Sequence, residues 1–243
     1  MASTAERPAF YALRPGGWRD LVTLLHPPYT AWHLSYVAIG AAAAPHLFAV
    51  RLVATLGAFF LAVGISAHAL DELHGRPLGT RLSDRTLWTL AAGGLGGALV
   101  LGGIGAVTVS PLLVVFMVVG SFTVVAYNLE VFGGALHNTT GFALAWGGLP
   151  AITSYWINAG ALHAGGLVVA LACVGLSVAQ RRLSAPAREL RRRTVAVSGS
   201  LRLIDGQSVE LSREQLAAPL EGALRALASA LVLLAAGLLL ARV

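Results

Sequence analysis

Long runs of apolar residues alternate with short polar segments along almost the whole chain. The runs are about 20 residues long, which is the length that a helix needs to cross the hydrocarbon core of a bilayer. They show no strict alternation of apolar and polar positions, so they favour helices over the strands of a transmembrane barrel. The pattern predicts seven spans, over residues 29–44, 47–70, 87–107, 112–127, 139–157, 162–179 and 219–240.

The composition indicates the same class of protein. Hydrophobic residues make up 56% of the chain and charged residues only 12%, which is about half of the charged share of an ordinary soluble domain. In hydrocarbon every backbone N–H and C=O must find a partner within the protein, and a bundle of helices provides these partners. We therefore expect an all-α, polytopic transmembrane helical bundle of residues 25–243, preceded by a cytoplasmic segment of residues 1–24.

The basic residues are distributed unevenly between the loops. All 17 of them are arginines, and most lie in residues 71–85 and 180–218, between apolar runs. Because positive charge is retained in the cytoplasm, these segments and residues 128–137 are predicted to be cytoplasmic, as is the N-terminus. Only Arg51 and Arg242 fall on the opposite side. The net charge of +6 then reflects topology in a multi-pass protein of the cell membrane, in contact with lipid and not with nucleic acid.

The long arginine-rich loop, residues 180–218, contains a pattern typical of a hairpin. Alternating segments at 200–204 and 208–211 flank the sequence Asp205-Gly206-Gln207. An Asp-Gly pair between alternating segments is a strong short-range signal for a tight turn between two antiparallel strands. We expect a small cytoplasmic β-hairpin beside the helical bundle.

Ionisable residues cluster at the predicted cytoplasmic end of the second span. His68, Asp71 and Glu72 are spaced i, i+3 and i+4, so they share one face of a helix. Two carboxylates and an imidazole on one face are candidate ligands for Mg²⁺ or a softer divalent ion. A helix end in which Asp71 pairs with Arg76 or Arg81 would give the same pattern, so both interpretations stay open.

A second polar cluster follows the fourth span. It comprises Tyr127, Asn128 and Glu130, and it is followed by His137 and residues 138–140 at the start of the fifth span. Tyrosine at a membrane interface and an Asn or Thr helix cap account for much of this pattern. A functional role for these residues is the alternative, and both interpretations stay open.

The order of several short segments resembles the UbiA superfamily of intramembrane prenyltransferases, and most of all its dihydroxynaphthoate-type quinone branch. Residues 67–75 correspond to the first Asp-rich motif, and Ala126-Tyr127-Asn128 to the tyrosine motif. The remaining matching segments are residues 24–40, residues 141–150 with Tyr155, and residues 192–197. The resemblance covers approximately residues 24–198 in one collinear order.

The resemblance implies a helical bundle whose polar cavity faces the cytoplasm and opens sideways into lipid. In this family, carboxylates hold Mg²⁺ on a polyprenyl diphosphate, whose departure leaves a carbocation that an acceptor captures. Asp71 would be a catalytic residue and a metal ligand, together with Glu72 or His68. Tyr127 and Asn128 would complete the catalytic set. The residues implied to contact the diphosphate are Arg76, Arg81, Arg188 and Arg192.

The chain also departs from the family pattern. Of the first motif only Asp71 is retained, and Leu183 and Ala187 stand where the second motif carries aspartates. Two main hypotheses follow: a divergent prenyltransferase with one metal and an arginine-rich lid, or a non-catalytic relative that binds an isoprenoid or anionic lipid or acts as an assembly partner. A small transporter or another metal-dependent membrane enzyme, based on His68, Asp71, Glu72 and His74, is a further alternative.

Overall fold

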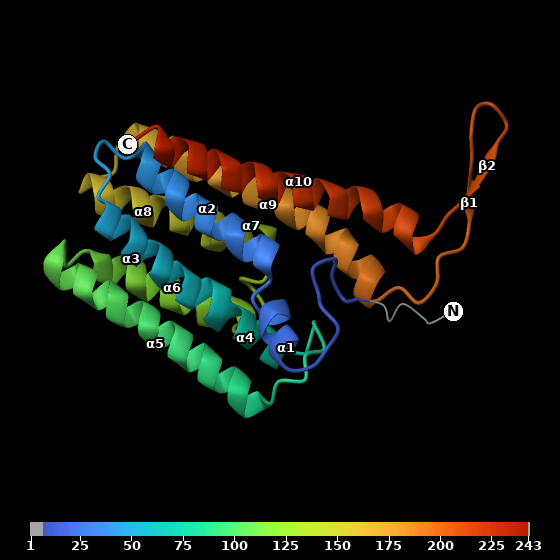
Figure 1. The fold of residues 1–243 in the computed structure, drawn as a ribbon, viewed down its shortest axis with the longest axis horizontal. Coiled ribbons are helices and arrows are strands. Elements are labelled where there is room, and N and C mark those ends of the chain that lie inside the picture. Colours follow the sequence, from blue (N-terminus) through green and yellow to red (C-terminus); the bar gives the residue numbers. More distant parts are fainter. Residues whose placement is uncertain (1–6, 243) are drawn as a thin grey trace.

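The computed structural model describes residues 7–242, and helices dominate it (Figure 1). The first half contains α1 (Trp18–Leu24), α2 (Pro27–Ala43), α3 (Ala49–Phe59), the π-helix η1 (Phe60–Ala67), α4 (His68–Leu73) and α5 (Asp84–Thr108). The second half contains α6 (Leu113–Asn128), α7 (Thr139–Ala143), the π-helix η2 (Leu144–Gly148), α8 (Leu149–Ala159), α9 (Ala164–Arg192), β1 (Ser200–Arg202), β2 (Ser208–Glu210) and α10 (Arg213–Leu240). The chain is thus an all-α bundle with one small hairpin.

The apolar runs correspond to helices, but the number of membrane crossings is not confirmed. Within residues 7–242, four helices are long and apolar enough to cross a membrane: Ala49–Leu73, Asp84–Thr108, Ala164–Arg192 and Arg213–Leu240. The first of these is a continuous helix formed by α3, η1 and α4. The prediction of an all-α membrane protein is therefore supported, whereas the count of seven spans stays a prediction.

Two helix boundaries differ from the prediction. The sixth run was expected to end at Ala179, but α9 continues to Arg192 and carries the first half of the arginine-rich segment. Its buried residues Ser177, Gln180, Ser184 and Ala187 lie on one face, because they are separated by three or four positions. The seventh helix begins at Arg213, not at Pro219, because the Ser212 and Gln215 side chains form a capping box.

The predicted hairpin is present. Strands β1 and β2 pair antiparallel, with Leu201 opposite Val209, and the chain turns at Gly206 with a φ of 87°. A left-handed residue at a tight turn favours glycine, which has no β-carbon to clash. The hairpin projects beyond the end of the helical bundle (Figure 1).

Small residues bring the helices close together, as glycine-rich membrane helices do. A β-carbon on Gly40 of α2 would overlap the carbonyl group of Ala151 on α8. Similarly, a β-carbon on Gly147 would lie 2.6 Å from the carbonyl oxygen of Cys173 on α9. The single cysteine, Cys173, is buried in this contact.

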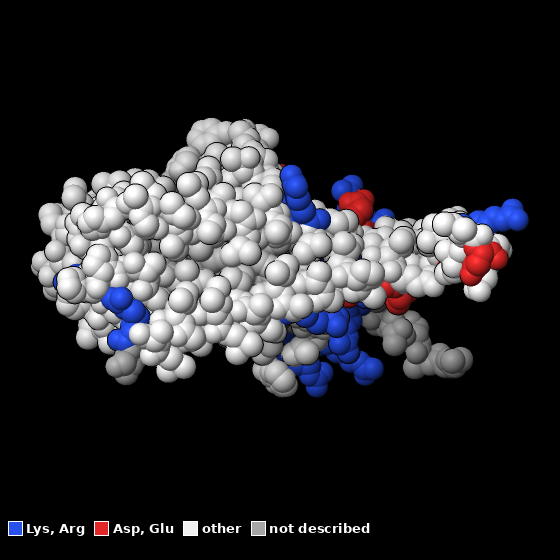
Figure 2. Space-filling view, turned by 90° about the horizontal axis from the view of Figure 1, so that it is seen from above, with Lys and Arg blue, Asp and Glu red and all other residues white. Residues whose placement is uncertain are grey.

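Charged side chains gather toward one end of the molecule (Figure 2). At the other end, Arg242 donates to the carbonyl oxygens of Ala44 and Pro45, and Arg51 donates to that of Ile157. The loops that are rich in arginine in the sequence therefore lie at one end of the bundle, and the loops with few arginines lie at the other.

Candidate functional site

A cavity opens at the charged end of the bundle and holds about 1540 Å³ of empty space, including its mouth. Its wall is formed by α2, η1, α4, α6, η2 and α9, together with Ala9 and Tyr11 of the N-terminal segment. We call it the polar cavity, because histidine, arginine and carboxylate side chains line it. The two polar clusters that the sequence predicts, around Asp71 and around Tyr127, meet in this cavity.

Three arginines of α9 line the polar cavity: Arg181, Arg188 and Arg192. They share one face of the helix because they are seven and four positions apart. Arg181 donates to the Tyr127 hydroxyl at 2.7 Å, and Nε of Arg192 donates to the Pro8 carbonyl oxygen at 3.1 Å. Guanidinium groups gathered in this way are suited to a ligand with phosphate oxygens.

Asp71 lies in the same cavity and is under the electrostatic influence of Arg188 and Arg192. Its carboxylate makes no hydrogen bond or ion pair with any residue in the range 7–242. Arg76 was one candidate partner, but it pairs with Asp84 and donates to the Leu82 carbonyl oxygen at 2.6 Å. Neither of the ion pairs of the alternative interpretation, Asp71 with Arg76 or with Arg81, is formed in the described part of the chain, and Asp71 lines the cavity.

Glu72 has a different environment from its neighbour Asp71. Its side chain is completely buried, and it accepts hydrogen bonds from the backbone N–H groups of Leu78 and Thr80 at 2.9 and 2.8 Å. The Thr80 hydroxyl donates a third, at 2.9 Å. The predicted catalytic and metal-binding carboxylate thus holds the loop after α4 in place and does not line the polar cavity.

The set of metal ligands that the sequence predicts is not assembled. His68 lines the cavity, and its Nδ1 lies 3.1 Å from the Gly64 carbonyl oxygen, which leaves Nε2 for other contacts. Among the described residues, no three His, Cys, Asp or Glu side chains converge to hold a metal ion. Mg²⁺ requires near-octahedral coordination by oxygen atoms. Asp71 is the one carboxylate of the predicted set that lines the cavity, so substrate phosphates and water would have to complete the coordination, and Mg²⁺ binding stays a prediction.

The remaining predicted residues divide into two groups. Tyr127 and Asn128 line the polar cavity, as expected, and the Tyr127 ring stacks on His137 with centroids 4.5 Å apart. Arg76 and Arg81 are not part of its wall. The backbone N–H of Arg81 instead donates to the buried carboxylate of Asp20, at 3.2 Å, so this loop is attached to α1.

The structure adds two residues that the sequence did not single out, His26 and Tyr11. His26 precedes α2 with a left-handed φ of 45°, and its ring stacks on His68 with centroids 4.0 Å apart. Its Nε2 is buried without a hydrogen-bond partner among the described residues. Burial, reinforced by His68, lowers the pKa of His26 well below its usual value, so the imidazole is neutral at physiological pH.

Tyr11 comes from a segment for which the sequence gave no signal of function. Its ring packs edge-on against Tyr29, with centroids 5.5 Å apart, and it closes part of the cavity. Burial raises the pKa of the Tyr11 hydroxyl above its usual value, so this group stays a neutral hydrogen-bond donor.

Gln180 is a third residue of the cavity wall that the sequence analysis did not single out, and it is buried. The spacing of the buried residues of α9 is the sequence signal that could have identified Gln180 as a cavity residue.

A second cavity, of about 1120 Å³, lies between α3, α5, α6 and α8. We call it the apolar cavity, because carbon atoms form almost all of its surface. Val63 and Trp146 line both cavities. They belong to η1 and η2, and short π-helical segments inside α-helices are frequent at functional sites. A polar and an apolar compartment therefore meet at two π-helical segments.

The arrangement matches a ligand with an anionic head and a hydrocarbon chain. The polar cavity, lined by four arginines, three carboxylates and neutral aromatic rings, would bind the head, and the apolar cavity would hold the chain. Comparisons with protein-family models, with curated proteins and with solved structures give no match to this chain. The geometry of the two cavities is therefore the basis for the function proposed below.

Proposed function

We propose that this chain is a divergent membrane prenyltransferase of the UbiA type, which transfers an isoprenoid from a polyprenyl diphosphate to a lipid-phase or aromatic acceptor. The observation that carries the proposal is the contact between the two cavities at Val63 and Trp146. A diphosphate head and an isoprenoid chain have the same two polarities as these compartments, which meet within the bundle.

The diphosphate would lie against Arg188 and Arg192, with Arg181 at the Tyr127 side of the cavity. Each guanidinium group can donate two parallel hydrogen bonds to phosphate oxygens, and its charge is always present. In a site partly screened from water, this positive field stabilises the negative charge that develops on a leaving diphosphate. The arginines would thus take over the neutralisation that the missing second aspartate motif provides in the family.

The reaction would begin with cleavage of the bond between C1 of the isoprenoid and the diphosphate oxygen. The diphosphate leaves with the bonding electron pair, and C1 becomes an allylic cation. An electron pair of the acceptor then forms the new bond to C1, and the acceptor loses a proton. Asp71, the carboxylate without a protein partner in this cavity, would accept that proton.

The proposal includes an orientation in the membrane. Seven crossings would place the charged end of the bundle, with the polar cavity, in the cytoplasm, because arginine-rich segments are retained there. A water-soluble diphosphate head then reaches the cavity from the cytoplasm, and apolar molecules approach from the bilayer.

A second candidate is a non-catalytic protein that binds an isoprenoid diphosphate or another anionic lipid. The hydrogen bonds that occupy Glu72 favour it, because they remove the second carboxylate from the site. Binding alone needs the arginines and the apolar compartment, but no proton acceptor. The two candidates therefore differ in the role of Asp71.

Turnover by the purified protein distinguishes them. The protein in lipid nanodiscs is incubated with labelled geranylgeranyl diphosphate, Mg²⁺ and a panel of aromatic and lipid-phase acceptors. The prenyltransferase proposal predicts a prenylated product with equimolar diphosphate, which Asp71→Asn abolishes and Asp205→Asn in the hairpin leaves unchanged. Tight binding without product supports the binding protein, and no binding contradicts both candidates.

A further inference from the structure

The apolar cavity extends along about 20 Å of α5, from Leu95 to Thr108, at about 1.5 Å per residue. It continues away from the polar cavity to the first residues of α6 at the other end of the bundle. Part of its rim faces outward, since Val50 is 82% and Ile104 is 56% exposed. In a membrane these rim residues contact lipid, so an apolar molecule can enter from the bilayer.

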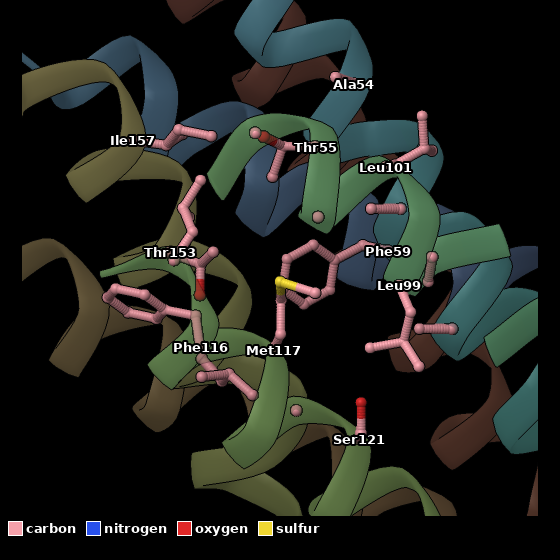
Figure 3. Close-up of a pocket in the computed structure, with 18 of the residues that line it drawn as sticks. Ala54, Thr55, Phe59, Leu99, Leu101, Phe116, Met117, Ser121, Thr153 and Ile157 are labelled. Atoms are coloured by element: carbon pink, nitrogen blue, oxygen red, sulfur yellow. The ribbon is translucent and has the colours of Figure 1, made fainter. Parts of the chain in front are cut away.

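Four residues of this carbon-lined wall carry hydroxyl groups, and Figure 3 shows two that differ from the others, Ser121 and Thr153. Ser121 of α6 directs its oxygen toward the interior of the cavity, and Thr153 of α8 lies across from it, near Phe116 and Met117. The Thr153 hydroxyl is buried and has no hydrogen-bond partner among residues 7–242. A buried hydroxyl without a partner costs free energy that a bound acceptor atom recovers.

Other threonines in the same wall satisfy their own hydroxyl groups. Thr55 donates to the Arg51 carbonyl oxygen at 2.7 Å, and Thr108 donates to that of Ile104 at 2.8 Å. This bond to the residue four positions earlier is the usual solution for threonine in a helix. Thr153 departs from it, so its hydroxyl, in a residue that lines the cavity, is left without an acceptor among the described residues.

The depth of Thr153 restricts what its partner can be. It lies six residues before Ala159, the last residue of α8, and therefore about 9 Å inside the helix end. The cavity wall around this hydroxyl is mainly apolar. A partner that fits the wall carries its oxygen acceptor on a largely hydrocarbon body.

From these observations we infer that the apolar cavity is a binding site for a neutral, membrane-soluble molecule whose carbonyl oxygen accepts a hydrogen bond from Thr153. Ser121 is another hydroxyl of this wall whose oxygen is directed into the cavity. The site goes beyond the proposed diphosphate site, because it requires none of the arginines of the polar cavity. The isoprenoid chain of the proposed diphosphate would use the same cavity, so the neutral molecule occupies it when that chain is absent.

Two matched probes test this inference in nanodiscs: pristane, a branched hydrocarbon, and phytone, in which a carbonyl replaces one methyl-bearing carbon. We expect phytone to bind about tenfold more tightly than pristane, because one additional hydrogen bond in an apolar site increases the affinity by about that factor. The preference should disappear in Thr153→Val, which keeps the shape, and remain in Thr153→Ser. The infrared carbonyl band of bound phytone should shift to lower frequency in the wild type and in Thr153→Ser only.

Two further variants make the result unambiguous. Gly120 lines the cavity, and a β-carbon there meets Leu149 at an ordinary 3.8 Å, so Gly120→Leu should fill the space and exclude both probes. Arg188→Gln should leave phytone binding unchanged, so that failure of the diphosphate site is distinguished from failure of this one. Equal affinity for the two probes in the wild type, no binding of either, or a preference that survives Thr153→Val would overturn the inference.

Discussion

Val63 of η1 and Trp146 of η2 each line both cavities of the bundle. These two side chains come from π-helical segments in different parts of the chain, and they are the boundary between a charged compartment and an apolar one. A ligand that occupies both compartments has to pass them. In the proposed function, the width of this boundary would decide whether a chain attached to a diphosphate can bind.

Enlarging Val63 tests this boundary. We expect Val63→Phe to lower the affinity for geranylgeranyl diphosphate at least tenfold and to leave the affinity for inorganic diphosphate unchanged, because it closes only the route of the chain. The overpacking itself should cost about 1–3 kcal/mol of stability. Calorimetric titration with both ligands measures the effect, and Val63→Ala is the control that keeps the passage open. An equal loss for both ligands would contradict the role of this boundary.

Glu72 is expected to be a residue of stability and not of ligand binding. Glu72→Ala leaves two backbone N–H groups of the loop, those of Leu78 and Thr80, without their acceptor. We expect a loss of about 2–4 kcal/mol in unfolding free energy, since each buried donor without a partner costs about 1–3 kcal/mol. Thermal unfolding measures this loss. At a temperature where the variant is folded, its affinity for diphosphate should stay within twofold of that of the wild type. A larger decrease would show that Glu72 takes part in ligand binding.

The pH dependence of stability follows from His26. Its pKa is lowered in the folded state by burial, while in the unfolded chain it is about 6.5, so the unfolded state binds more protons below that pH. The contribution of His26 is therefore present above pH 6.5 and is lost as the pH falls. We expect the melting temperature to decrease between pH 6.5 and 5.

His26→Asn is the matched variant for this prediction, since asparagine tolerates the left-handed backbone at position 26. Below pH 6.5 this variant should lose less unfolding free energy than the wild type, by up to about 1.4 kcal/mol per pH unit. Its melting temperature should therefore decrease less. Identical pH profiles of wild type and variant would show that His26 is not the group that titrates.

The sequence predicts the helical segments and the hairpin because these depend on local patterns. Apolar runs specify helices in a bilayer, and Asp205-Gly206 between alternating residues specifies a turn. The end of α9 was missed because hydropathy falls at Gln180 and Pro186 resembles a helix breaker, although α9 continues through it. The periodic small residues Ser184 and Ala187 carry the signal that the helix continues.

The site was predicted in part, for a physical reason. Spacing places Asp71 and Glu72 near one another on a helix, but it does not tell which carboxylate faces a cavity. Tertiary contacts decide this, because the loop after α4 folds back to donate its N–H groups to Glu72. Likewise Tyr11, which closes part of the polar cavity, reaches it through the path of the N-terminal segment, which no local motif specifies.

In the proposed function, the arginines of α9 hold a diphosphate in the polar cavity. The most direct measurement is the affinity of the protein in nanodiscs for geranylgeranyl diphosphate, in the wild type and in three variants. Arg188→Gln and Arg192→Gln should each weaken binding at least tenfold, because each removes charge-assisted hydrogen bonds to phosphate, whereas Arg182→Gln, outside the cavity wall, should have no effect. Equal affinities for all four proteins would contradict the account.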